Sequence, residues 1–290
     1  MRIIMLAILA LLAGHVSSAT EYVVAHTPAP VLNSPDFSKV FGGSDGRKLK
    51  TDRCGQIREL EYIAMKGSIF RVVNKLHTER GEVYQVESDE YTPSPNNRLY
   101  VDRRFVEVND GSARRKLLLP EQAEIAAALR ASVGGSYIWG GNVAGGVPEL
   151  SAWFFTGIRP EEAKNFTLAG LDCSGLLYHA TGGWTPRNTA QLINYGQSVA
   201  IAGLQAAEIT ALLRPLDLIV WNGHVIIVLD KFTAIESRLE CGRTGNGGVV
   251  MTPLQKRVAE VMRTRRPVNV WQSRNKVQDV FVVRRWHVQP

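Results

Sequence analysis

The apolar and polar positions change pattern along the chain. Between residues 20 and about 112, short runs rich in Val, Ile and Tyr alternate in part with polar residues. Turn sequences such as SPDFS, GGSDGR, ERGE and YTPSPNN separate these runs, and this arrangement is typical of β-strands. The strands expected here are EYVVAH, QIRELEYIAM, SIFRVVNKL, EVYQVES and RLYVDRRFVEV. Several short strands at this spacing predict a small all-β barrel.

From residue 113 onward, the pattern predicts helices first and strands afterwards. An amphipathic helix is expected in LPEQAEIAAALRAS (119–132), and a short helix is expected to begin near Cys173. Segments 205–213 and 253–264 are also helical in pattern. The strands expected later are LDLIVW, HVIIVLD, FTAIESRL and DVFVVRRW. The sequence therefore predicts an α+β domain at 113–290 that follows an all-β domain at 20–112.

The first nineteen residues differ from both domains. MRIIMLAILALLAGHVSSA has one basic residue, an apolar run from Ile3 to Ala13 and small residues at its end. This order predicts a secretory signal peptide cleaved after Ala19, because the apolar run is too short to span a bilayer. The alternative is a buried helix. We therefore expect an exported protein of the periplasm or cell envelope, with no stable membrane anchor.

Charge and metal-ligand spacing limit the classes of partner. The formal net charge is +7, but the basic residues are scattered and are not interleaved with aromatic residues. We therefore expect no nucleic-acid partner. The glycine-rich GRTGNGG (242–248) lacks the Lys-Ser/Thr of a phosphate-binding loop. Because His, Cys and acidic residues have no zinc-like spacing, we expect no metal and no other cofactor.

The chain has three cysteines, which are too few for a disulfide framework in an exported protein of this length. A bridge between Cys54 and Cys241 is one alternative, and it would leave Cys173 as the odd thiol. Asp172 is a suitable N-cap for a helix that begins at Cys173, and a helix N-terminus lowers the pKa of a thiol. Cys173 is therefore interpreted as a nucleophile, against the alternative of a structural cysteine.

A thiol nucleophile needs a base, and His224 is the candidate because it begins an apolar strand directly after WNG. The alternative is a histidine exposed at a strand end. If residues 229–231 form a three-residue loop, His224 lies opposite Glu236; if only residues 230–231 turn, it faces Ser237. We favour Glu236, whose carboxylate would orient the imidazole as the third member of a triad. A solvated acid is the alternative.

Four motifs in this order resemble those of the NlpC-type cell-wall cysteine peptidases. They are YIWGG (137–141), DCSG (172–175), PRNTAQL (186–192) and LDLIVWNGHVIIVLD (216–230). The N-terminal domain resembles the bacterial SH3 domains that are often fused to these enzymes. The resemblance implies a papain-like catalytic domain after a small SH3-like barrel. It also implies hydrolysis of peptidoglycan stem peptides at the bond between γ-linked D-Glu and the following diamino acid.

The same resemblance implies roles for individual residues. Cys173 would be the nucleophile and His224 the base, and Tyr137 would help to place the oxyanion or the substrate. Asp172 and Ser174 would bind the substrate, with Asp172 pairing with a free N-terminal amine of L-Ala. For Asp172 this role competes with helix capping.

The sequence departs from this family at two places. The family's third catalytic position is commonly a histidine, whereas Glu236 stands here. Segment 142–169 is longer than in simple members, and its aromatic residues are expected either to cover the groove as a lid or to pack against the SH3-like domain. The alternative functions are a thiol-dependent acyltransferase or amidase, and a wall-binding module with a decayed active site.

Overall fold

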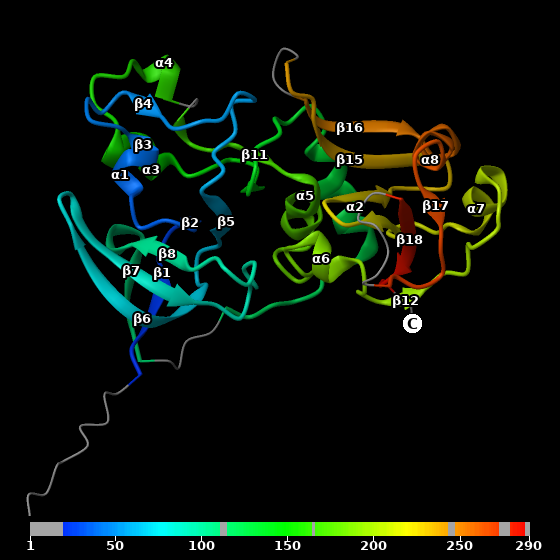
Figure 1. Cartoon of the computed structure of the whole chain (residues 1–290), viewed down its shortest axis with the longest axis horizontal. Helices are drawn as coiled ribbons and strands as arrows, with labels where there is room; N and C mark the ends of the chain where they lie inside the picture. The colour runs from blue at the N-terminus through cyan, green and yellow to red at the C-terminus, as the bar shows by residue number, and fades with distance from the viewer. Residues whose placement is uncertain (1–19, 111–114, 164–165, 243–246, 273–278, 288–290) are drawn as a thin grey trace, which may run out of the picture.

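The computed structural model describes residues 20–110, 115–163, 166–242, 247–272 and 279–287, so the expected signal peptide lies outside the described residues. Two large sheets dominate the molecule, one built from the first part of the chain and one from the last part (Figure 1). Short helices and loops lie between them. The described residues include no helix that is long and apolar enough to cross a membrane.

The first sheet contains seven strands, and every pairing in it is antiparallel. In spatial order the strands are β5 (Leu60–Ala64), β2 (Ala29–Leu32), β8 (Leu99–Asp102), β7 (Gly81–Glu87), β6 (Ile69–Thr78), β1 (Tyr22–Ala25) and β9 (Val106–Asn109). The five expected strand segments are all present. The chain between β2 and β5 adds α1 (Phe37–Val40), β3 (Phe41–Gly42) and β4 (Lys48–Leu49), and η1 (Arg103–Phe105) separates β8 from β9.

The second sheet is antiparallel except for one short parallel pairing, between β17 and β18. Its order is β12 (Gln197–Ser198), β18 (Val280–Arg285), β13 (Leu218–Trp221), β14 (His224–Val228), β15 (Thr233–Leu239) and β16 (Gly247–Pro253), with β17 (Arg266–Pro267) beside β18. The four later strands that the sequence predicts are present. Strand β16 was not expected, because it begins in the glycine-rich segment and ends at a proline.

Helices cover both faces of the second sheet. One face packs against α2 (Gln122–Ala131), α5 (Cys173–Ala180) and α6 (Thr189–Leu192), and the other packs against α7 (Ala206–Leu212) and α8 (Leu254–Met262). Alternate residues of β13 and β14 enter the two cores. These strands therefore read as continuous apolar runs, since neither of their faces meets water.

The long segment before α5 belongs to the core of the first sheet. It contains β10 (Asn142–Val143), α3 (Pro148–Phe154), α4 (Pro160–Ala163) and β11 (Gly170–Leu171). Phe154 and Phe155 are buried in that core, and Trp153 packs against it. Of the two alternatives for segment 142–169, the structure therefore shows packing. The core of the first unit also extends beyond the boundary expected near residue 112.

Candidate active site

Cys173 is the first residue of α5, as the sequence predicts. Asp172 caps this helix, and its Oδ1 accepts a hydrogen bond from the backbone N–H of Gly175 at 2.6 Å. Seven of the eight residues of α5 are buried. An apolar helix of this kind needs cover on several sides, which the second sheet and α2 supply. The nucleophile candidate is thus fixed on a rigid element.

The thiol of Cys173 lies against the backbone on both sides of His224. Its Sγ donates a hydrogen bond to the carbonyl oxygen of Gly223 at 3.8 Å, and the backbone N–H of Val225 also faces the sulfur. The Cys173 side chain is only 6% exposed. The structure therefore brings the sulfur to the backbone at the start of β14, while the His224 side chain lies on the face of the sheet opposite α5, and the contacts of Cys173 among the described residues do not include the imidazole.

The pKa of Cys173 differs from the sequence-based expectation. Burial, with the negative charge of Asp172 as the second cause, raises the pKa of the thiol to about 12. These effects exceed the opposing ones, namely the charge of Arg187 and the backbone N–H groups of Val225 and Ser174. The expectation of a lowered pKa at the helix N-terminus is therefore wrong for this state of the protein. At neutral pH the sulfur rests as a thiol.

His224 and Glu236 are joined by a hydrogen bond between Nε2 and Oε2 of 2.6 Å. The expected strand register is nevertheless wrong, because Ala234 pairs with Val228 rather than with Ile226. The hairpin turns through residues 230–232 instead of 229–231, and this slides the strands by two residues. A shift of two keeps every side chain on the same face, so Glu236 reaches His224 diagonally.

Ser237, the other candidate partner for His224, points to the opposite face of the sheet. Its hydroxyl donates a hydrogen bond to the carbonyl oxygen of Leu171 at 2.6 Å, at the start of the DCSG segment. Ser237 is completely buried. It therefore helps to fix the chain before α5 and does not contact the imidazole.

Arg257, on α8, binds the carboxylate of Glu236 with two nitrogens. The Nε–Oε1 distance is 2.6 Å, and the second terminal nitrogen of the guanidinium lies 3.0 Å from Oε2. Glu236 is only 1% exposed, and burial alone would raise its pKa. The hydrogen bonds from His224 and Arg257 outweigh that effect and lower the pKa of Glu236 to about 2. The carboxylate is therefore ionised at any physiological pH.

A tilted aromatic contact holds His224 from a second direction. The ring of Trp221, its cross-strand neighbour, lies 5.0 Å from the imidazole between centroids. The guanidinium of Arg265 covers the same indole at 4.4 Å. The imidazole is therefore held both through Nε2 and through its ring face.

Tyr137 is buried beside the nucleophile. Its pKa is raised by burial first and then by the nearby charges of Asp172 and Cys173, so the phenol stays protonated. Its side chain is 8% exposed. Tyr137, Asp172 and Cys173 therefore influence one another electrostatically, and the role of Tyr137 in placing the oxyanion or the substrate stays a prediction.

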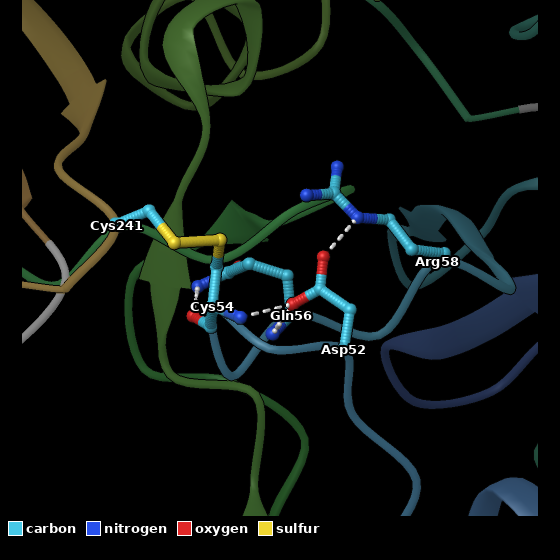
Figure 2. The surroundings of a disulfide bond; sticks show 5 residues. All are labelled: Asp52, Cys54, Gln56, Arg58 and Cys241. Carbon is cyan, nitrogen blue, oxygen red and sulfur yellow. Dashed lines mark hydrogen bonds and ion pairs between the residues drawn. A yellow bond between two sulfur atoms is a disulfide. The ribbon is translucent and has the colours of Figure 1, made fainter.

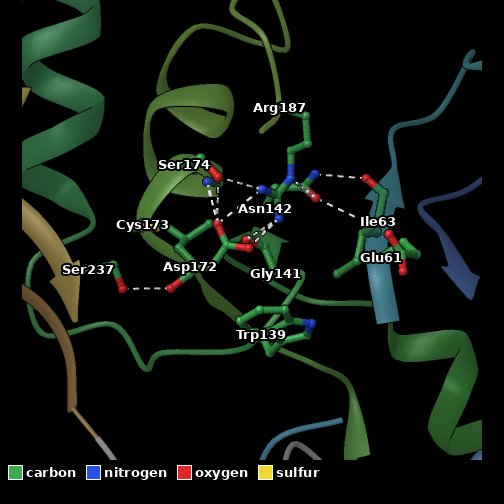
Figure 3. Close-up of polar contacts among 12 residues, drawn as sticks. Glu61, Ile63, Trp139, Gly141, Asn142, Asp172, Cys173, Ser174, Arg187 and Ser237 are labelled. Atoms are coloured by element: carbon green, nitrogen blue, oxygen red, sulfur yellow. Dashed lines mark hydrogen bonds and ion pairs between the residues drawn. The ribbon is translucent and has the colours of Figure 1, made fainter. Parts of the chain in front are cut away.

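Asp172 and Ser174 have a partner that the sequence analysis did not identify (Figure 3). Two nitrogens of Arg187 lie 3.0 and 2.6 Å from the oxygens of Asp172, and one of them also lies 2.9 Å from the hydroxyl of Ser174. Arg187 is 1% exposed. The capping role of Asp172 is present, and its ionic partner in this structure is Arg187 rather than a free site for an amine.

Arg187 also connects the nucleophile segment to the first sheet. Its Nε donates to the side-chain oxygen of Asn142 at 3.1 Å. Asn142 in turn accepts from the N–H of Ile63 at 3.0 Å and donates to the carbonyl oxygen of Ile63 at 2.8 Å. The amide thus pairs with β5 as a neighbouring strand would (Figure 3).

A disulfide joins Cys54, before β5, to Cys241, after β15 (Figure 2). This is the pairing that the sequence left open, and Cys173 is the free thiol. Beside the bridge, Gln56 accepts a hydrogen bond from the backbone N–H of Trp139 at 2.8 Å, and the guanidinium of Arg58 lies 4.4 Å from the indole centroid. The bridged loop therefore contacts the YIWGG segment directly.

The described residues contain no group of three or more His, Cys, Asp and Glu side chains arranged to hold a metal ion. Within the glycine-rich GRTGNGG segment, residues 243–246 lie outside the described part of the chain.

Comparisons with known proteins give matches among solved structures only. No protein-family model and no curated protein matches the sequence. An NlpC/P60 family protein from Bacillus cereus is 15% identical with a TM-score of 0.35, and the alignment covers 92% of this chain and 63% of that one. NlpC2 from Trichomonas vaginalis is 13% identical with a TM-score of 0.33, covering 93% and 74%.

An NlpC/P60 endopeptidase from Photobacterium damselae subsp. piscicida is 15% identical with a TM-score of 0.28, covering 81% of this chain and 46% of that one. The chain thus spans less than two thirds of the Bacillus cereus protein.

Proposed function

We propose that this protein is an exported cysteine peptidase that cleaves peptidoglycan stem peptides between γ-D-Glu and the following diamino acid. One observation carries the proposal: the Cys173 thiol lies against the backbone that flanks His224, and Glu236 holds the Nε2 of that histidine. The resemblance of the four motifs supports the choice of substrate.

The His224–Glu236 contact defines which nitrogen acts as the base. An ionised carboxylate only accepts hydrogen bonds, so Nε2 carries the proton and Nδ1 is left to accept the proton of the thiol. Since Cys173 rests as a thiol, His224 takes its proton only if the imidazole reaches the sulfur in the reacting complex. A base–nucleophile pair of this kind activates a weak nucleophile only in the reacting complex.

The reaction then proceeds in two steps. The sulfur of Cys173 bonds to the γ-carbonyl carbon of D-Glu, and the protonated phenol of Tyr137, which Cys173 influences electrostatically, would stabilise the developing oxyanion. His224 returns the proton to the leaving amine as the C–N bond breaks. Water, deprotonated by His224, hydrolyses the thioester and releases the peptide acid.

The preference for a free N-terminal amine stays a prediction. Arg187 already contacts both oxygens of Asp172, so a substrate amine would have to share this carboxylate with a guanidinium. Ser174, whose hydroxyl lies 3.2 Å from the same carboxylate, would face the same neighbour.

Mass spectrometry of L-Ala-γ-D-Glu-diaminopimelate after incubation with the protein tests the proposal. We expect release of L-Ala-D-Glu and diaminopimelate, and no release with Cys173→Ala. An N-acetylated peptide that is cleaved equally well would remove the free-amine preference only. No cleavage of either peptide by the wild-type protein would refute the peptidase function and favour an acyltransferase, an amidase or a binding role.

A further inference from the structure

Glu236 stands in a position where its charge poses a chemical problem. A buried carboxylate beside an imidazole stabilises the protonated imidazolium, whereas a base must be neutral to accept a proton. The Glu236 carboxylate is 1% exposed and lies 2.6 Å from Nε2 of His224, so water screens their interaction weakly. Without a counter-charge, the carboxylate would favour the protonated, positively charged form of the imidazole.

Arg257 supplies the balancing charge. Its two contacts, at 2.6 and 3.0 Å, occupy both oxygens of Glu236, and only one of these oxygens also meets His224. We propose that Arg257 is a positioning residue of this site, which holds Glu236 in place and neutralises it so that Glu236 orients His224 without keeping it protonated. The proposal deepens the proposed function and rests on it for its kinetic consequences.

The packing of α8 fixes the position of Arg257 relative to Glu236. The helix begins directly after β16 and buries Leu254, Val258 and Val261 against the sheet face that carries His224 and Glu236. Arg257 lies beside this buried stripe, and its other terminal nitrogen lies 3.4 Å from Glu260, one turn later. The side chain is therefore held at both ends of its guanidinium.

Other charged groups near the pair are few among the described residues. From β14 the imidazole of His224 faces Glu236, and from β16 the cross-strand neighbour is the apolar Val250. After α8, Arg265 interacts electrostatically with Arg257 and with Asp279, and it stacks on Trp221. The charged groups are His224, Arg257, Glu260, Arg265 and Asp279, together with Arg238, which lies two residues after Glu236 on the same face of β15 and pairs with Glu240 at 3.7 Å.

The test measures His224 directly. NMR of the histidine ring carbons in the full protein follows the protonation of His224 with pH, with His224→Asn providing the assignment. In Arg257→Gln the uncompensated carboxylate should move the titration midpoint of His224 upward by about one pH unit. Arg263→Gln, the same change at an exposed position at the end of α8, should leave the midpoint unmoved.

Kinetics give a second readout if the peptidase function holds. In Arg257→Gln the acid limb of kcat/KM should shift upward with the His224 titration, so that activity at pH 6 falls about tenfold while activity at pH 8 stays within about threefold. The loss should appear in kcat, with KM unchanged. A uniform loss at every pH, with an unshifted His224 titration, would overturn the proposal.

Two further variants extend the test: one covers the case in which Arg257→Gln does not fold, and the other asks whether Arg257 acts through Glu236. Arg257→Lys keeps the positive charge but loses the bidentate contact with Glu236. Its His224 titration midpoint should lie close to that of the wild-type protein. In the Glu236→Gln background, adding Arg257→Gln should shift His224 by less than half as much, since Arg257 acts through Glu236. A full-size shift in that background would refute the role of Glu236. A wild-type protein that cleaves no peptide, with a shifted His224 titration in the variants, would refute the function and keep this inference.

Discussion

Arg187 donates hydrogen bonds from two nitrogens, at 3.0 and 2.6 Å, to the carboxylate of Asp172. Asp172 is the residue directly before Cys173, which carries the free thiol. Both partners are buried, and the helix that carries the thiol begins at this carboxylate. The position of the nucleophile therefore depends on a buried ion pair whose basic member comes from a different segment of the chain.

Removing Arg187 should lower the free energy of unfolding far more than removing an exposed arginine. Arg187→Met leaves the Asp172 carboxylate buried without its counter-charge, and we expect a loss of about 3–5 kcal/mol in the free energy of unfolding. Urea denaturation measures this loss. Arg159→Met, which breaks an exposed pair with Glu162, is the matched control and should cost less than about 1 kcal/mol. A loss below 1 kcal/mol for Arg187→Met would contradict the assignment.

The raised pKa of Cys173 predicts a slow reaction with neutral alkylating agents. At pH 7.5 the folded protein should react with iodoacetamide at least about 100-fold more slowly than the unfolded protein, and the rate should rise steadily up to pH 10. Because folding raises the pKa of this thiol, its contribution to stability is present below about pH 8.5 and is lost as pH rises toward 12. Intact-mass spectrometry measures the rate, and comparable rates for the folded and unfolded protein would contradict the prediction.

The lowered pKa of Glu236 predicts an acid-dependent loss of stability. A carboxylate whose pKa is about 2 when folded and about 4.3 when unfolded stabilises the protein fully above the higher value, and this contribution disappears as pH falls toward the lower one. Glu236→Gln should therefore lower Tm at pH 7 but flatten the fall in Tm between pH 5 and pH 3. Thermal unfolding at pH 7, 5 and 3 measures both effects. Parallel curves for the two proteins would rule out this contribution.

The bridge between Cys54 and Cys241 spans 187 residues of sequence. A disulfide typically stabilises a protein by about 2–4 kcal/mol, and the entropic part of this effect grows with loop length. Reduction should therefore lower the urea midpoint, and Cys54→Ser with Cys241→Ser should do the same without reductant. A Cys173→Ala background prevents thiol exchange. If the oxidised and reduced proteins unfold at the same urea concentration, the bridge contributes nothing.

Local patterns in the sequence predict the elements that hold the candidate site. The capping acid at Asp172, followed by an apolar helix, places Cys173 correctly, and the apolar run after His224 places that residue at the start of a strand. Both features arise from residues within one turn or one strand, where periodicity and capping are informative.

Local sequence patterns do not predict contacts between distant segments of the chain. Arg187 lies inside the PRNTAQL motif and Asn142 directly follows YIWGG, yet nothing in their spacing shows that one buried arginine links the two segments. The strand register was wrong by two residues because the backbone N–H of Phe232 bonds to the Asp230 side chain in the turn. Arg257 follows an unpredicted strand, so its approach to Glu236 depends on tertiary packing alone.

The disulfide also changes what a break in the backbone would do. The polypeptide passes from the first sheet to α2 between Asn109 and Gln122, and Cys54 and Cys241 lie on opposite sides of that passage. A protease that cut the chain there would leave both fragments in one covalent molecule. Under oxidising conditions the nicked protein would remain one covalent molecule, and after reduction the fragments would be held only by non-covalent packing such as that of Phe154 and Phe155 in the core of the first sheet.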